Sequence, residues 1–97
     1  MFPYRLPEVD NSSRYIIYGT GEIASQYYYQ LSEKFGEDSI AFFLDTYSSK
    51  KTFKEKPVLN PQVLIERNDL NNYLFLIASI AAKEEMTLTL RKFGIKE

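Results

Sequence analysis

Short apolar runs of strand length alternate with helix-like patterns along this chain, and this alternation constrains the fold more than any other feature. The runs cover residues 15–18, 40–44 and 73–78, and they are continuously apolar rather than alternating between apolar and polar residues. A strand of this kind is buried on both faces, which is typical of a parallel sheet with helices on each side. The sequence therefore predicts an α/β fold in three layers, helix–sheet–helix.

Two stripes of apolar residues recur at helical spacing, one after the first run and one after the third. They consist of Ala24, Tyr28, Leu31 and Phe35, and of Ala82, Met86, Leu90 and Phe93. Gly36 and Gly94 stand where a helix C-cap belongs. A shorter helix is expected over residues 61–67, because Asn60 is a good N-cap and Pro61 suits the first helical position.

Right-handed crossover connections predict the strand order 2-1-3, with the first strand in the centre. Residues 57–59 are expected to form a minor edge strand, because proline is tolerated at an edge. The polar, lysine-rich residues 46–56 are expected to form a loop. Residues 1–13 are expected to form an N-terminal arm before a single domain of residues 14–97. This arrangement is a small Rossmann-like half of a doubly wound fold. Residues 95–96 are considered as the start of one more strand, but there is no room for a second half.

Composition argues against several functional classes. The 97 residues include no cysteine and no histidine, which removes the commonest general base and the commonest transition-metal ligands. A net charge of −1 argues against binding nucleic acid through phosphate neutralisation. The longest nearly unbroken apolar run, residues 73–82, is far shorter than the roughly 20 residues of a membrane span. We therefore expect a cytoplasmic domain with no metal site, no membrane span and no nucleic-acid partner.

One motif in the sequence is typical of a nucleotide-binding site. Residues 19–24, GTGEIA, match the pattern G-x-G-x-x-G/A, and they lie between a predicted strand and a predicted helix, as a dinucleotide-binding turn does. Gly19 permits the tight turn, Gly21 lets the backbone approach a pyrophosphate, and Ala24 lets the helix lie close to the strand. The helix N-terminus then offers N–H groups and a partial positive charge to a phosphate.

Asp45 extends this site. It ends the second strand, near the position where an acidic residue accepts hydrogen bonds from a ribose diol. Its carboxylate would repel a 2′-phosphate and so favours NAD over NADP, although Lys50 and Lys51 lie nearby in the sequence. Ser79 follows the third strand, at the edge where ligands bind. The residues expected to bind a nucleotide are Gly19, Thr20, Gly21, Glu22, Ile23, Asp45 and Ser79. Glu22 also argues against binding, since it places a negative charge near an incoming phosphate.

Other catalytic patterns are rejected. Tyr47 and Lys51 formally match Y-x-x-x-K, the catalytic pair of short-chain dehydrogenases, but they fall in an expected loop instead of a helix. The chain has no P-loop motif. Tyr18 occupies the place where a methyltransferase would carry an acidic residue. With no histidine or cysteine, no catalytic acid or base is identified, and whether the chain is an enzyme is left open.

The chain resembles a known family over nearly its whole length. The resemblance rests on residues 14–24, Tyr28 and Gln30 of the first helix, residues 44–45, residues 56–58, residues 74–80 and residues 93–95. The family is the small Rossmann-like domain of bacterial surface-polysaccharide loci. It occurs in nucleotide-sugar-modifying proteins, in sugar acyltransferases and beside FkbM-type methyltransferases or glycosyltransferases. The resemblance implies that Gly19, Thr20, Gly21 and Ile23 line a phosphate site and that Asp45 lines a ribose site. Ala24 stands where many members have glycine.

Two functions follow as expectations. The first is a domain that binds NAD or a nucleotide-sugar and serves surface-sugar biosynthesis or modification. The second is a non-catalytic accessory or assembly domain of a larger methyltransferase, acyltransferase or glycosyltransferase that has lost its ligand. A complete oxidoreductase is the weakest alternative, because hydride transfer needs a substrate pocket over the nicotinamide. Open sheet edges and Leu88, which falls off the buried stripe, predict a homodimer or docking to a catalytic domain.

Overall fold

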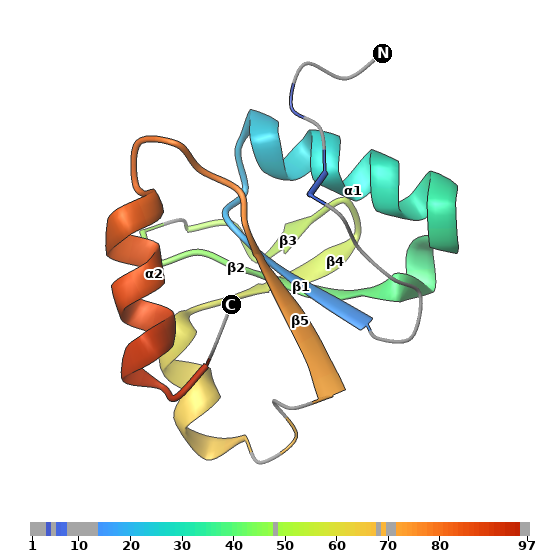
Figure 1. The fold of residues 1–97 in the computed structure, drawn as a ribbon. Helices are drawn as coiled ribbons and strands as arrows, with labels where there is room; N and C mark the ends of the chain where they lie inside the picture. The colour runs from blue at the N-terminus through green and yellow to red at the C-terminus, as the bar shows by residue number, and fades with distance from the viewer. Residues whose placement is uncertain are drawn as a thin grey trace.

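A five-stranded mixed sheet forms the centre of the protein, whose computed structural model describes residues 4, 6–7, 14–47, 49–67, 69 and 72–95. The strands lie in the order β3-β4-β2-β1-β5 (Figure 1). They are β1 (Arg14–Tyr18), β2 (Ile40–Leu44), β3 (Thr52–Phe53), β4 (Lys56–Leu59) and β5 (Tyr73–Ile77). The helices are α1 (Glu22–Phe35) and α2 (Lys83–Lys92), with 3-10 segments η1 (Glu37–Ser39) and η2 (Pro61–Glu66).

The strand β1 lies between β2 and β5 and is parallel to both. Its last residue, Tyr18, is aligned with Leu44 at the end of β2 and with Ile77 at the end of β5. Two backbone hydrogen bonds extend these ladders: Gly19 N–H to the Leu44 carbonyl at 2.7 Å, and Ala78 N–H to the Tyr18 carbonyl at 2.9 Å. The carboxyl ends of three strands therefore meet at one edge of the sheet.

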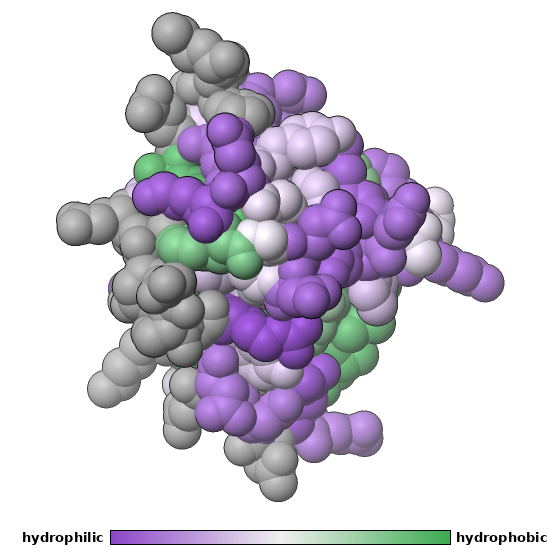
Figure 2. Space-filling view, turned by 90° about the vertical axis from the view of Figure 1, so that its right-hand side faces the viewer, coloured by the Kyte–Doolittle hydropathy of each residue, from purple (hydrophilic) through white to green (hydrophobic). Residues whose placement is uncertain are grey.

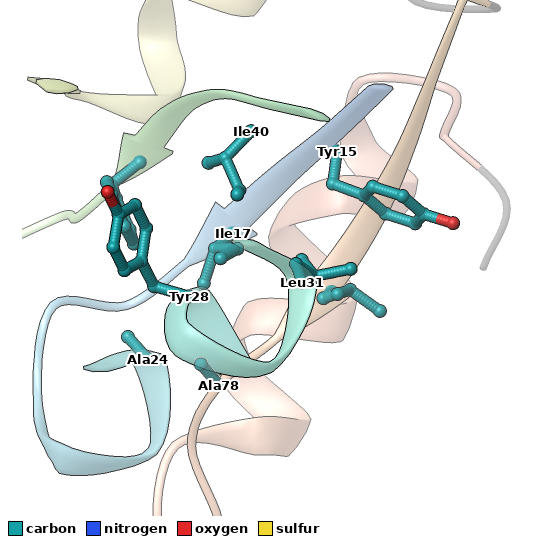
Figure 3. Packing of buried hydrophobic residues seen from close by; sticks show 9 residues of the cluster. Tyr15, Ile17, Ala24, Tyr28, Leu31, Ile40 and Ala78 are labelled. Atoms are coloured by element: carbon teal, nitrogen blue, oxygen red, sulfur yellow. The ribbon is translucent and has the colours of Figure 1, made fainter. Parts of the chain in front are cut away.

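Each face of the sheet carries its own apolar cluster. On one face, Tyr15 and Ile17 of β1 pack with Ala24, Tyr28 and Leu31 of α1 (Figure 3). On the other face, Ile16 and Tyr18 belong to a cluster that includes Leu64 of η2, Leu90 of α2 and Ile95. Because successive residues of a strand point to opposite faces, β1 supplies both clusters and is almost completely buried. The three-layer α/β architecture predicted from the sequence is confirmed.

The sheet is larger than expected and is not wholly parallel. Residues 46–56, expected as a loop, contain β3, which pairs antiparallel with β4. The intervening turn places Lys54 and Glu55 at positive φ, 53° and 63°. Phe53 is held in β3 because its ring packs edge-to-face on Phe43 of β2, with centroids 4.9 Å apart. Residues 57–59 are a strand, but β3 lies outside them, so the expectation of an edge strand there is wrong.

Two further expectations are corrected, and one lies largely outside the described residues. The segment at 61–67 is 3-10 helix over Pro61–Glu66 rather than α-helix, although Asn60 caps it as predicted by accepting a 2.9 Å hydrogen bond from Gln62 N–H. Residue 95, considered as the start of another strand, instead buries its side chain beside α2.

Of the arm, only residues 4, 6 and 7 are described; the backbone N–H groups of Tyr4 and Leu6 donate to the side chains of Gln26 and Gln30 on α1. Among the described helices, none has the length and apolar character needed to cross a membrane.

Candidate functional site

The turn between β1 and α1 lies where the carboxyl ends of the strands meet. Gly19 has φ 126°, a conformation that L side chains rarely adopt. A Cβ atom at this position would also approach the Ala78 carbonyl oxygen to 3.0 Å. Gly19 is therefore required by the fold itself, since it lets the turn pass close to the end of β5.

Gly21 is a different kind of glycine. It is the exposed N-cap residue of α1, and its φ of −98° and ψ of −155° are accessible to any residue. A Cβ atom built on it meets no described atom within 4 Å. As a glycine, Gly21 has no side chain with which to cap the first turn of α1. The helix therefore presents its first-turn N–H groups at an uncrowded glycine, which is the geometry of an anion-binding helix start.

Thr20 and Asp45 join the turn to the end of β2. The Thr20 hydroxyl donates a 2.7 Å hydrogen bond to Oδ2 of Asp45, and the backbone N–H of Tyr47 donates to Oδ1 at 3.0 Å. Thr20 is buried, whereas Asp45 is half-buried. The two parts of the predicted site, which are distant in sequence, are thus in direct contact.

Lys50 adds a positive charge that the sequence did not identify as a site residue. Its Nζ donates a 3.2 Å hydrogen bond to the Thr20 carbonyl oxygen and lies 5.0 Å from the centre of the Phe53 ring. The signals in the sequence were the lysine content of residues 50–56 and the closeness of Lys50 to Asp45. Its position depends on the β3–β4 hairpin, which brings this segment back beside the turn.

Glu22 and Ile23 are placed differently from the backbone groups of the turn. The Glu22 carboxylate accepts a 2.8 Å hydrogen bond from Nε2 of Gln26, one turn further along α1. The half-buried side chain of Ile23 packs against the cluster beneath α1. The Glu22 side chain is therefore engaged along α1, and the Ile23 side chain is engaged with the core. Ala24 is completely buried, in keeping with the close approach of α1 to β1.

Ser79 has a structural partner. Its hydroxyl oxygen accepts a 3.0 Å hydrogen bond from the backbone N–H of Ala82, the N-cap residue of α2. The residue lies at the carboxyl edge of the sheet, as expected, but its side chain helps to form the turn that leads into α2.

The segment after β2 is fixed by two tyrosine hydroxyls. The Tyr18 hydroxyl lies 2.7 Å from Oγ1 of Thr46, and the Tyr47 hydroxyl donates to Oε1 of Glu85 at 2.7 Å. The hydrogen bond to Glu85, together with the nearby charge, raises the pKa of Tyr47 above its ordinary value. Tyr47 and Lys51 lie on non-helical backbone, so the rejection of a dehydrogenase Y-x-x-x-K pair agrees with the structure.

The described residues contain no cluster of three or more acidic side chains that would hold a metal ion. Comparison of the chain with protein-family models, with curated proteins and with solved structures gave no match.

Proposed function

We propose that the carboxyl edge of the sheet binds a nucleotide, either an NAD-like dinucleotide or a nucleotide-sugar. In this proposal the first turn of α1 receives a phosphate, and Asp45 receives the hydroxyl groups of a ribose. The resemblance noted from the sequence suggests that the ligand serves bacterial surface-sugar biosynthesis or modification. The order of β2, β1 and β5 supports a Rossmann-like assignment, in which ligands bind where crossovers leave the central strand in opposite directions.

Gly21 is the observation that carries the proposal. Neither its backbone conformation nor any described neighbour requires a glycine there. A ligand pressed against the backbone would require one, because a side chain would occupy the space of the phosphate. The contrast with Gly19, which the fold does require, supports a ligand as the reason for Gly21.

Asp45 and Lys50 support the same proposal through their charges. Ribose hydroxyls would replace the Thr20 hydroxyl as donors to the Asp45 carboxylate, which accepts hydrogen bonds only. The ammonium group of Lys50, held beside the Thr20 carbonyl, would offset part of the negative charge of a phosphate at the turn.

A second function, that of an accessory domain without a ligand, is favoured by one specific observation. Both carboxylate oxygens of Asp45 already accept hydrogen bonds from within the protein, from Thr20 and from Tyr47. In this alternative, Asp45 only fixes the segment after β2, and the fold serves as a docking unit for a larger enzyme.

The test is isothermal titration calorimetry with NAD, NADP and UDP-sugars on the wild type, Gly21→Asp and Asp45→Asn. Aspartate is a good N-cap residue, so Gly21→Asp should keep or raise the thermal midpoint while its charge repels a phosphate. A matched control is Asn72→Asp, which adds the same charge at the amino end of β5, away from the site.

We expect one ligand to bind the wild type and Asn72→Asp alike, with at least tenfold weaker binding to both site variants, roughly the loss of one charge-assisted hydrogen bond. If no nucleotide binds the wild type at millimolar concentration, the proposal is wrong and the accessory function is favoured. Binding that both site variants retain would place the ligand elsewhere.

A further inference from the structure

The outward face of α2 carries an exposed apolar residue between charges of opposite sign. Met86, Leu90 and Phe93 face the cluster beneath the helix. Leu88 lies on the opposite side of the helix and is 63% exposed, and Ile80, in the turn before α2, is 73% exposed. Both line an open groove of about 530 Å³, together with Ala81 and Thr87, and Glu84 and Arg91 also border it.

The charges on α2 are separated along its length. Glu84 and Glu85 occupy the first turn, and Arg91 and Lys92 occupy the last turn. Lys83, at the first position of the helix, is the exception. Acidic N-terminal and basic C-terminal turns complement the helix dipole, which accounts for the signs of the charges. The dipole does not account for a leucine placed on the solvent side between them.

We propose that α2 is a self-association surface, on which a second copy of this chain packs its own α2 in antiparallel orientation across a two-fold axis near Leu88. Glu84 and Arg91 are spaced almost symmetrically about Leu88, so the axis places Glu84 of each copy opposite Arg91 of the other. A parallel arrangement would place like charges together. Leu88 would then pack against Leu88 of the second copy, and the contact would bury both side chains away from water.

Figure 2 views the protein from the side away from α2, and its surface there is mostly hydrophilic, with separate apolar patches. The proposed surface is also small: α2 has 10 residues, which span about 15 Å. A contact of this length buries less than a standard interface of roughly 1,600 Å², so the dimer should be weak and should depend on protein concentration.

Sedimentation velocity over a concentration series from about 10 μM to 1 mM tests the proposal, a range suited to weak association. The wild type should shift from monomer towards dimer. Leu88→Lys should raise the dissociation constant at least about tenfold, since each copy loses a buried leucine. Its effect on the stability of α2 should be small, because the favourable pair with Glu84, four residues earlier, offsets the repulsion from Arg91 and Lys92. Ile65→Lys is the matched control: Ile65 is 65% exposed but does not line the groove, so its dimer should be unchanged.

A charge exchange tests the antiparallel orientation. Glu84→Arg alone and Arg91→Glu alone should each weaken the dimer, because each places like charges opposite one another. The double variant should restore it, although its thermal midpoint should fall because the exchanged charges oppose the helix dipole. Three outcomes would each overturn the proposal. The wild type stays monomeric at 1 mM, the dissociation constant of the dimer is unchanged by Leu88→Lys, or the double variant dimerises no more tightly than the single variants.

Discussion

The Thr20 hydroxyl donates a 2.7 Å hydrogen bond to the carboxylate of Asp45, and this bond connects the turn after β1 to the end of β2. The two residues belong to different strand ends, and both lie at the edge where β1, β2 and β5 terminate. The bond has one structural consequence and one functional consequence. It holds the turn against the end of β2, and under the proposed function it is the bond that a ribose would have to displace.

Thr20→Val should remove this bond while keeping the shape of the side chain. We expect a loss of about 1.5 kcal/mol in the free energy of unfolding, at the low end for a bond to a charged group because Asp45 is only half-buried. Urea denaturation measures the change. Thr52→Val, at an exposed position of β3, should change stability by less than about 0.5 kcal/mol. Equal effects of the two substitutions would contradict the structural role given to Thr20.

Alanine at the two glycines of the turn should have unequal effects. Gly19→Ala forces a side chain into a backbone of φ 126° and close to the Ala78 carbonyl oxygen, so it should cost about 2 kcal/mol or more. Gly21→Ala has space around it and should cost only about 0.5 kcal/mol, because alanine is a poorer N-cap residue than glycine. Thermal denaturation of both variants gives the comparison. A large loss for Gly21→Ala would mean that the fold itself requires this glycine.

Ser32→Ala should stabilise the protein. The hydroxyl oxygen of Ser32, on α1, is buried and has no hydrogen-bond partner among the described residues. Its removal relieves an unsatisfied polar group and improves helix propensity, with an expected gain of about 1 kcal/mol. Ser25→Ala, at a half-buried position on the same helix, reports the propensity effect alone. If the two substitutions give the same gain, burial of the Ser32 hydroxyl carries no penalty.

The stability of the η2 region should depend on pH through Asp69. Arg67 donates two hydrogen bonds to this carboxylate, at 2.9 and 3.0 Å, and they hold the pKa of Asp69 below its ordinary value. Since the pKa is lowered in the folded state, the stabilisation is complete above the unfolded pKa of about 3.9 and is lost as the pH falls through the folded value.

Asp69→Asn should therefore lower the thermal midpoint at neutral pH but have little effect at strongly acidic pH. Differential scanning calorimetry across this range measures the difference between variant and wild type. Glu33→Gln, at an exposed position of α1, is the control and should give no such trend. A difference that persists undiminished at acidic pH would mean that the ion pair does not contribute.

Local patterns were sufficient to predict most of the helices and strands. The apolar stripe from Ala24 to Phe35 predicted α1, and Gly36 follows its last residue with an N–H bonded to the Ser32 carbonyl. The continuously apolar runs predicted β1, β2 and β5, because strands that are buried on both faces consist of consecutive apolar residues. The motif at residues 19–24 and Asp45 were expected to meet at one edge, and they do.

Features that depend on tertiary contacts were not predictable. β3 has only two residues, and the reason for its existence is the packing of Phe53 on Phe43, which no local pattern reveals. The position of Lys50 beside Thr20 follows from that hairpin. The cap at Asn60 marked where η2 begins, but not that its six residues would adopt 3-10 geometry.

The central position of β1 has a consequence for how the chain folds during its synthesis. β1 leaves the ribosome before its partners β2 and β5, and the cluster on one of its faces includes Leu90 and Ile95. Contacts of such high sequence separation form slowly, because long loops must close first. A nascent chain that ends before residue 73 holds β1 with one edge unpaired and open to association with other chains. We therefore expect a single folding event once residues 73–95 have emerged, not a stepwise one that follows the order of the strands in the sequence.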